Sequence, residues 1–345
     1  MLKPRHLLMS LFIAANGCFL QSASVPIALA QVAPAPGLAE RERGIAHYNQ
    51  NKTKEAVSTL KSAVKKDKTD HQAWYYLGLA QVKLKDYKEA AKSLQKVVQL
   101  QPDFALGHNA MAYTALMRDR LSEAKREADL TLRLDPNIKE AHYISGVANL
   151  REGDTVKALK AAEVVIKLDP KLAVGYLLKS QALVGFAGTP SSPPGESTEV
   201  RNARYLEAAG ALEKYLELDP NTKYKQTWIE QLDSLRFYVS ARDEGSSANR
   251  AYSGKEVTTK ARVLAKPEPR YSEDARKRGV TGTVVLRCIF AADGTPKHFI
   301  VVAGLPYGLT ENALAAARKI RFTPATRDGK PVSMFIQLEY NFNLY

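Results

Sequence analysis

A period of 34 residues in the middle of the chain constrains its fold more than any other feature. Prolines 102, 136 and 170 stand in similar contexts, "QLQPDFA", "RLDPNIK" and "KLDPKLA". A self-similar period of this length is typical of arrays in which each unit is one pair of antiparallel helices. One unit cannot bury its own apolar face, so we expect neighbouring units to stack into a continuous core.

Small residues recur in the register of the prolines. Ala124 and Ala158 repeat the position of Ala90, and Gly146 repeats that of Gly78. Small side chains let the two helices of a unit approach closely, and a proline ends the second helix because it lacks a backbone N–H. The sequence therefore predicts helix pairs with close contacts at fixed places.

The unit from His71 to Pro102 resembles a tetratricopeptide repeat. Its matching residues stand at the family's signature spacings: Trp74, Leu77, Gly78, Ala90, Leu94 and Pro102. The resemblance implies an all-α solenoid, which we place at residues 38–242 with about five repeats and a capping helix from Lys223. A loop insertion is expected near 187–203, where "GTPSSPPGEST" is rich in Pro, Gly and Ser.

Such repeats imply a concave groove, lined by the first helix of each unit, that binds a peptide or protein segment. The predicted groove residues are Tyr75, Leu79, Lys83, Asn109, Tyr113, Leu116, Tyr143, Val147 and Arg151. The alternative for each is packing between neighbouring repeats.

His108 and His142 occupy the position of Trp74, so we interpret them as repeat-equivalent core residues. No other His, Cys or carboxylate set has ligand spacing, and we expect no metal or cofactor.

The first thirty residues predict export from the cytoplasm. Lys3 and Arg5 precede the apolar run "LLMSLFIAANGCFL", and "ALA" ends at Ala30. This pattern is typical of a signal peptide cleaved after Ala30, and an uncleaved anchor is the alternative. Of the two cysteines, Cys18 lies in this segment, so no disulfide is expected within the exported chain. We therefore expect an exported protein, anchored to the membrane if the segment is retained.

After a linker, 243–256, the composition changes to one typical of strands. "GTVVLRCIF" and "KHFIVVAG" flank the turn "AADGTP", which predicts a hairpin. A short helix begins at Ser272 and a second near Leu309, and the last strand alternates apolar and polar residues from Val332 to Phe342. We expect a small α+β domain at residues 257–345, an antiparallel sheet with helices on one face.

This domain resembles the C-terminal domain of the TonB energy transducers. The matching motifs are Pro269-Arg270-Tyr271, Gly282-Thr283-Val284, Phe322-Thr323-Pro324-Ala325 and Gly329-Lys330-Pro331-Val332, with Ser272 in place of a second proline. The resemblance implies that the final strand is a sheet edge to which a transporter segment, the TonB box, adds as a strand. The implied contact residues are Ser333, Met334, Phe335, Gln337, Leu338 and Glu339. For Phe335, contact with a helix edge or with a second copy in a homodimer is the alternative.

The chain departs from the family pattern at its N-terminal end. Transducers typically have a membrane helix with a functional His that couples to ExbB–ExbD, but His6 precedes the apolar run. The net charge of +14 is spread along the chain, and we expect no nucleic-acid partner and no enzymatic activity. Three interpretations stay open: a TonB-like transport protein whose repeats recruit a partner, a non-energised periplasmic adaptor for envelope assembly, and a soluble competitor for TonB boxes.

Overall fold

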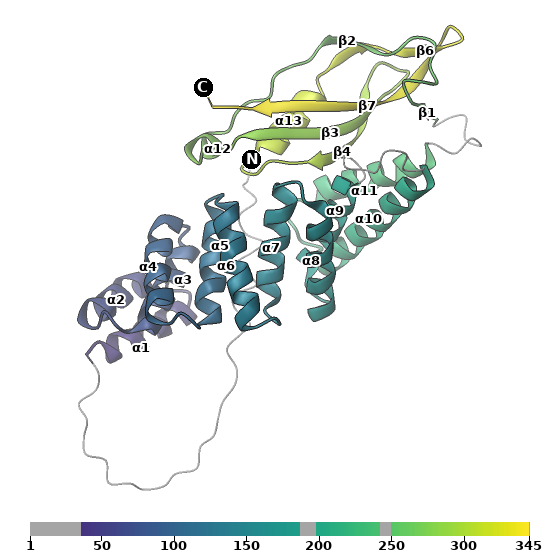
Figure 1. The fold of residues 1–345 in the computed structure, drawn as a ribbon. Helices are drawn as coiled ribbons and strands as arrows, with labels where there is room; N and C mark the ends of the chain where they lie inside the picture. Colours follow the sequence, from purple (N-terminus) through teal and green to yellow (C-terminus); the bar gives the residue numbers. More distant parts are fainter. Residues whose placement is uncertain (1–35, 187–197, 242–249, 345) are drawn as a thin grey trace. The chain divides into compact units, whose positions relative to one another are not determined.

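The computed structural model describes residues 36–186, 198–241 and 250–344. These residues divide into two compact units, and the division falls between Ile144 and Ser145, inside helix α7 (Lys139–Arg151) (Figure 1). The expected export segment, 1–30, and most of the expected insertion, 187–203, lie outside the described residues. Each unit is described by itself.

The first unit consists of consecutive helix pairs. Its helices are α1 (Leu38–Asn49), α2 (Thr53–Lys66), α3 (His71–Lys83), α4 (Tyr87–Leu100), α5 (Ala105–Met117) and α6 (Leu121–Leu134). Within each pair the second helix packs on the first, and α3 also packs on α2. Leu60, Leu77 and Leu94 are fully buried along the apolar core that results.

Close helix contacts occur where the repeat has glycine. A Cβ added at Gly78 would lie 2.7 Å from the side chain of Leu94, and one at Gly44 would lie 2.5 Å from that of Leu60. Contacts this short are closer than carbon atoms tolerate, so the second helix of each pair can approach only because these positions lack a side chain. The predicted role of the small residues is confirmed at these two repeats.

One hydrogen bond recurs at the same place in four repeats. A ring donates to the backbone carbonyl six residues earlier, across the turn that precedes the first helix. The bonds are Trp74 Nε1 to Lys68 O (3.0 Å), His108 Nε2 to Pro102 O (2.9 Å), His142 Nε2 to Pro136 O (2.9 Å) and Tyr176 OH to Pro170 O (3.2 Å). The two histidines therefore occupy the position of Trp74 in structure as well as in sequence.

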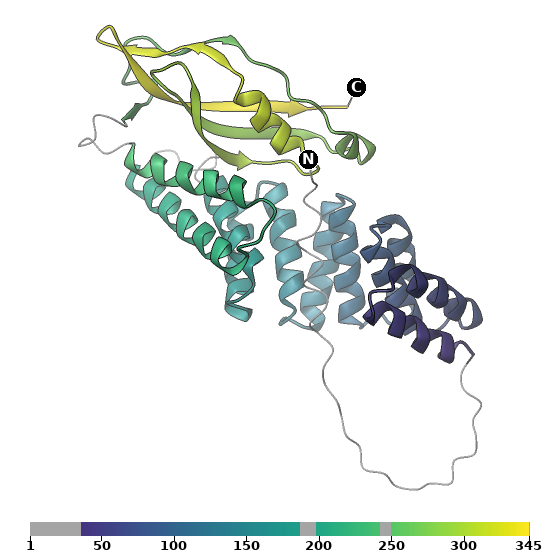
Figure 2. The same ribbon diagram turned by 180° about the vertical axis from the view of Figure 1, so that it is seen from behind.

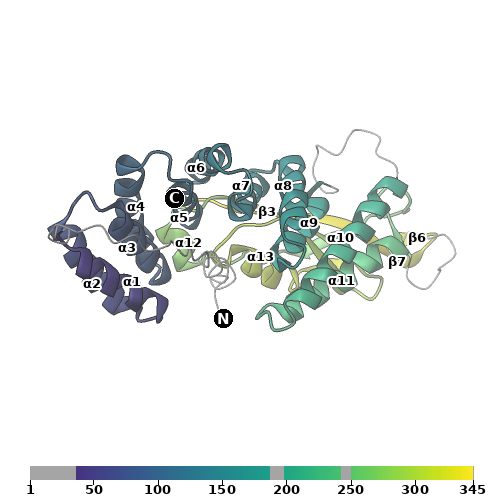
Figure 3. The same ribbon diagram turned by 90° about the horizontal axis from the view of Figure 1, so that it is seen from below.

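The second unit begins with the end of α7 and continues with α8 (Thr155–Leu168), α9 (Ala173–Phe186), α10 (Thr198–Leu218) and α11 (Lys225–Ser240). α9 packs on α8 and α10, and α11 packs on α10 (Figure 3). Residues 198–203, within the expected insertion, form the first turns of α10. In the described part of the chain, eleven helices precede the sheet, in an order that corresponds to five pairs and one further helix.

The C-terminal part of this unit is a sheet with two short helices. Its elements are β1 (Ala251–Tyr252), β2 (Arg262–Ala265), α12 (Glu273–Lys277), β3 (Gly282–Phe290), β4 (Pro296–Ala303), α13 (Leu309–Ala317), β5 (Arg321–Thr323), β6 (Ala325–Arg327) and β7 (Lys330–Phe342). The strand order is β1-β7-β3-β4, with β6 also paired to β7, while β2 and β5 form a separate ribbon. α13 packs on β3 and β4 (Figure 2).

The long strand β7 is buried on one face, as its period of two predicts. Leu338, Tyr340 and Phe342 are buried, whereas Gln337, Glu339 and Asn341, which alternate with them, are exposed. β7 pairs antiparallel with β3 from Met334 to Phe342. The buried face joins Leu286, Cys288 and Phe290 of β3 and the apolar side of α13 in one core.

The hairpin, both helices and the α+β domain are confirmed, and the sheet is antiparallel except at β1, which makes it mixed. β1 pairs parallel with β7, Ala251 opposite Ser333 and Tyr252 opposite Met334. β1 lies in the segment expected to be a linker, 243–256. The short strands β2, β5 and β6 were not predicted either, because runs of two to four residues carry too little periodicity to be recognised.

Candidate functional site

The two outer strands of a sheet have backbone groups that face away from their neighbours, and these groups can pair with another chain. In this sheet the two edges are that of β4 and the outer edge of β7. They differ in what covers them. The difference determines which edge is open to an incoming strand.

The β4 edge is closed by a side chain of α11. Gln231 Nε2 donates to Phe299 O at 2.8 Å, and the Val301 N–H donates to Gln231 Oε1 at 3.3 Å. A side-chain amide has both a donor and an acceptor, so Gln231 makes the two bonds that a neighbouring strand would make. The middle of the β4 edge is thereby satisfied without a further strand.

Other contacts from the helices surround this closure. The ring of His298 stacks on Phe237 with 3.7 Å between centroids, and Arg318 Nη2 lies 2.7 Å from Glu230 Oε2. Arg287 Nη1 on β3 donates to Tyr205 OH at 2.8 Å. Burial lowers the pKa of His298, and the neighbouring Lys297 lowers it further. The helices α10 and α11 therefore contact the sheet through packed and charged groups, beyond chain connectivity.

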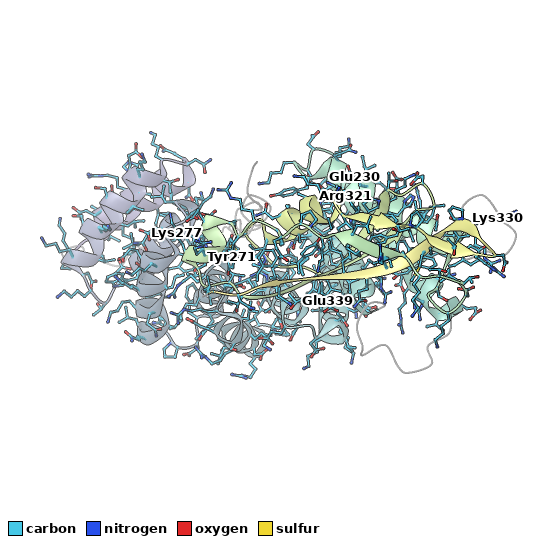
Figure 4. The ribbon with its side chains drawn as sticks, turned by 90° about the horizontal axis from the view of Figure 1, so that it is seen from above. Glu230, Tyr271, Lys277, Arg321, Lys330 and Glu339 are labelled. Carbon is cyan, nitrogen blue, oxygen red and sulfur yellow. The ribbon has the colours of Figure 1, made fainter. Side chains whose placement is uncertain are left out.

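The outer edge of β7 is covered only over its first part. β6 pairs with residues 330–332, and β1 with Ser333 and Met334. Beyond Met334, no strand in the described ranges pairs with this edge. Figure 4 labels Lys330 and Glu339 on this strand. The stretch of edge without a strand partner in the described ranges runs from Phe335 to Phe342.

One contact shows which backbone groups point outward on this stretch. Lys266 Nζ donates to Glu339 O at 2.7 Å and lies 4.5 Å from the centre of the Tyr340 ring. Because backbone groups of a strand alternate in direction, Gln337 and Asn341 direct their N–H and C=O groups to the same side as Glu339. A cation therefore lies at the centre of the open edge.

The six predicted contact residues of the final strand divide into three groups. Ser333 and Met334 already pair with β1, and the Ala292 N–H donates to Ser333 Oγ at 3.2 Å. Leu338 is buried in the core, and the ring of Phe335 lies 5.4 Å from that of Tyr238 on α11. Gln337 and Glu339 are exposed on the open stretch.

Three residues of this region were not predicted from the sequence: Gln231, Lys266 and Asn341. Gln231 lies on a helix expected only to close the array, and Lys266 lies in a proline-rich segment without periodicity. No local pattern shows that either side chain reaches a strand far away in sequence. Asn341 belongs to the alternation of β7 and follows from it once the edge is known.

The predicted groove residues of the first helices are mostly buried or already bonded. Lys83 Nζ donates to Asn51 Oδ1 at 3.2 Å and lies 3.8 Å from the centre of the Tyr48 ring, and burial lowers its pKa. The Tyr75 ring meets that of Phe104 at 5.1 Å, and burial raises the pKa of Tyr75. The buried members are Leu79, Asn109, Tyr113, Leu116 and Tyr143, and the half-buried ones are Val147 and Arg151.

The described residues include neither a candidate metal site nor a candidate membrane-spanning helix. No group of three or more His, Cys, Asp or Glu side chains there is arranged to hold a metal ion. None of the helices in residues 36–186, 198–241 and 250–344 combines the length and the apolar character needed to cross a bilayer.

Comparison with known proteins identifies both parts of the chain. Residues 267–344 match the model of the Gram-negative bacterial TonB protein C-terminal family, and residues 41–103 and 109–173 match a tetratricopeptide repeat model. Protein TonB of Vibrio cholerae serotype O1 is 35% identical over 89 residues, 26% of this chain and 36% of that protein. The chain thus spans about a third of the length of this relative.

Solved structures similar to the chain are repeat proteins. The chain of MamA from Desulfovibrio magneticus RS-1 that runs from residue 41 to the end is 20% identical, with a TM-score of 0.44 over 54% of this chain and 97% of that one. A thermophilic TPR protein of Thermus thermophilus is 17% identical, with a TM-score of 0.42 over 58% of this chain and 98% of that one. From the family matches, the chain combines tetratricopeptide repeats with a C-terminal domain of the TonB family.

Proposed function

We propose that the outer edge of β7, from Phe335 to Phe342, binds an extended segment of an outer-membrane transporter as an additional strand. The observation that carries the proposal is the contrast between the two edges. Gln231 occupies the β4 edge, whereas β7 has an open stretch beyond Met334. Of the two edges, the β7 edge beyond Met334 is therefore the one that we propose as the binding edge.

The bound segment would be held mainly by backbone hydrogen bonds. Gln337, Glu339 and Asn341 each offer an outward N–H and C=O, and an incoming strand pairs with them whatever its sequence. Each such bond contributes about 0.5–1.5 kcal/mol. The ammonium group of Lys266 leaves Glu339 O when the strand arrives.

The repeats serve in this proposal to recruit a second protein. Tetratricopeptide repeats and TonB domains are both protein-interaction modules, which supports a binding role rather than catalysis. The similarity to a TonB protein supports a place in the cell envelope. We propose that the chain works in the periplasm, and that contact with ExbB–ExbD requires the N-terminal segment to remain as a membrane anchor.

A matched pair of variants at Gln337 tests the edge. Gln337→Pro removes the outward N–H and places a ring in the path of the strand, whereas Gln337→Ala removes only the side chain. The probes are synthetic peptides covering the N-terminal plug segments of transporters from the same bacterium, with affinity measured by fluorescence anisotropy.

We expect Gln337→Ala to bind as the unchanged protein does and Gln337→Pro to bind at least about tenfold more weakly. Circular dichroism verifies that both variants are folded. Equal binding by the two variants refutes strand addition at this edge. Absence of binding by the unchanged protein refutes the transporter as partner and favours the adaptor interpretation.

A further inference from the structure

The first unit has a hollow of about 500 Å³ between α2, α4 and the start of α3. Its volume falls in the range of pockets that bind small ligands or side chains. It is lined by second helices of two neighbouring repeats, whereas the predicted groove is lined by first helices. The lining residues are Lys61, Val64, Lys65, Lys68, Trp74, Lys96, Gln99 and Leu100.

The hollow is apolar inside and positive around its margin. Val64, Trp74 and Leu100 supply the apolar lining, and Trp74 is only half-buried. Because the Trp74 indole N–H is already bonded to Lys68 O, the ring offers the hollow an apolar surface. The four lysines are exposed, so their ammonium groups can reach a ligand seated there.

These lysines lack acidic partners within the part of the chain that the structure describes, unlike others close by. Lys66 is paired with Glu40 and Lys92 with Glu89, each at 2.6 Å. Lys61, Lys65, Lys68 and Lys96 take part in no ion pair there, and Lys96 Nζ donates only to Gln99 Oε1 at 3.2 Å.

Glu89 is a carboxylate close to Lys61. Its pKa is lowered chiefly by its hydrogen bond to Lys92, and to a smaller degree by Lys88 and Lys61. Its charge is therefore already matched by Lys92. Four like charges around one hollow repel one another, and a ligand with negative charge relieves the repulsion.

We propose that this hollow binds an acidic segment of a partner protein, with one apolar or aromatic side chain inserted and its carboxylates placed among the four lysines. The concave shape favours a protein segment over a bilayer, because a flat lipid surface leaves a hollow unfilled. An inserted anchor side chain with a charged rim is the usual arrangement of a protein interface. This site is separate from the β7 edge and is tested independently of it.

The experiment uses the full chain and a short labelled peptide with a central Phe between pairs of Glu. Lys61→Gln/Lys65→Gln removes two charges from the margin, and Lys54→Gln/Lys88→Gln removes two exposed charges outside it. Trp74→Leu removes the indole ring from the lining. Anisotropy gives the affinities, and thermal unfolding verifies the fold of each variant.

We expect the Lys61/Lys65 variant to bind the acidic peptide about tenfold more weakly than the unchanged protein. The Lys54/Lys88 variant should bind the peptide like the unchanged protein, because salt screens the long-range attraction of these two charges. Replacing the central Phe by Ala should weaken binding to the unchanged protein but have little effect on Trp74→Leu. Equal losses in the two double variants overturn the proposal, as does binding to phosphatidylglycerol vesicles without binding to the peptide.

Discussion

Replacing Gln231 by Ala tests whether this side chain acts as a substitute strand. The change leaves Phe299 O and the Val301 N–H on β4 without their partner. Each hydrogen bond contributes about 0.5–1.5 kcal/mol, so the local loss is about 2 kcal/mol. This loss of local stability exceeds the loss expected from replacing an ordinary exposed polar residue, because the hydrogen bond of Gln231 to Phe299 O is partly buried.

Hydrogen exchange of the Val301 amide measures this loss directly. At about 1.4 kcal/mol for each factor of ten, a loss of about 2 kcal/mol speeds exchange by roughly thirtyfold. Gln226→Ala is the matched control, because Gln226 lies on the same helix and bonds only Glu230 at an exposed position. An unchanged exchange rate in Gln231→Ala, with chain folding verified, refutes the closure of this edge.

Two further predictions concern pH and helix packing. Because burial and Lys297 lower the pKa of His298 below 6.5, the contribution of His298 to stability is full above about pH 6.5 and falls as the pH decreases toward the lowered pKa. The variant His298→Asn keeps a residue that tolerates the left-handed backbone at this position, and it should reduce the fall of the urea midpoint between about pH 7.5 and about pH 5.5. An unchanged dependence of the midpoint on pH contradicts the assignment to His298. Gly78→Ala should lower the thermal midpoint, because the added Cβ clashes with the side chain of Leu94. Gly210→Ala is the control: the added Cβ meets no atom within 4 Å, so the change should stabilise the helix by about 0.5–1 kcal/mol and raise the midpoint. Stabilisation by both changes refutes the close contact at Gly78.

The features that sequence predicted correctly depend on local pattern. The alternation along β7, the N-cap of α12 and the hairpin turn are each determined within a few residues, and all three form as expected. Ser272 Oγ accepts from the Ala275 N–H at 3.2 Å, and Gly294 adopts a positive φ of 82° in the turn. Local chemistry is strong enough at these places to determine the structure.

The features that sequence did not predict depend on contacts between distant residues. Strand β1 has two residues, and nothing in "AY" shows that it pairs with Ser333 and Met334. Gln231 contacts a strand about seventy residues away. The stretch of β7 without a strand partner therefore begins after the first two expected contact residues, because Ser333 and Met334 pair with β1, and it includes Asn341. Which edge remains open is determined by such long-range pairings.

The recurring ring-to-carbonyl bond has a consequence for how the repeats can diverge. Trp74, His108, His142 and Tyr176 are chemically unlike, yet each donates across the same turn. The position thus requires a side chain long enough to place a hydrogen-bond donor at the carbonyl six residues earlier, and several residue types meet that requirement. A repeat can therefore lose its signature tryptophan and keep its turn. The sequence of a unit can diverge until the repeat signature is no longer recognisable, while the geometry of the turn stays constant.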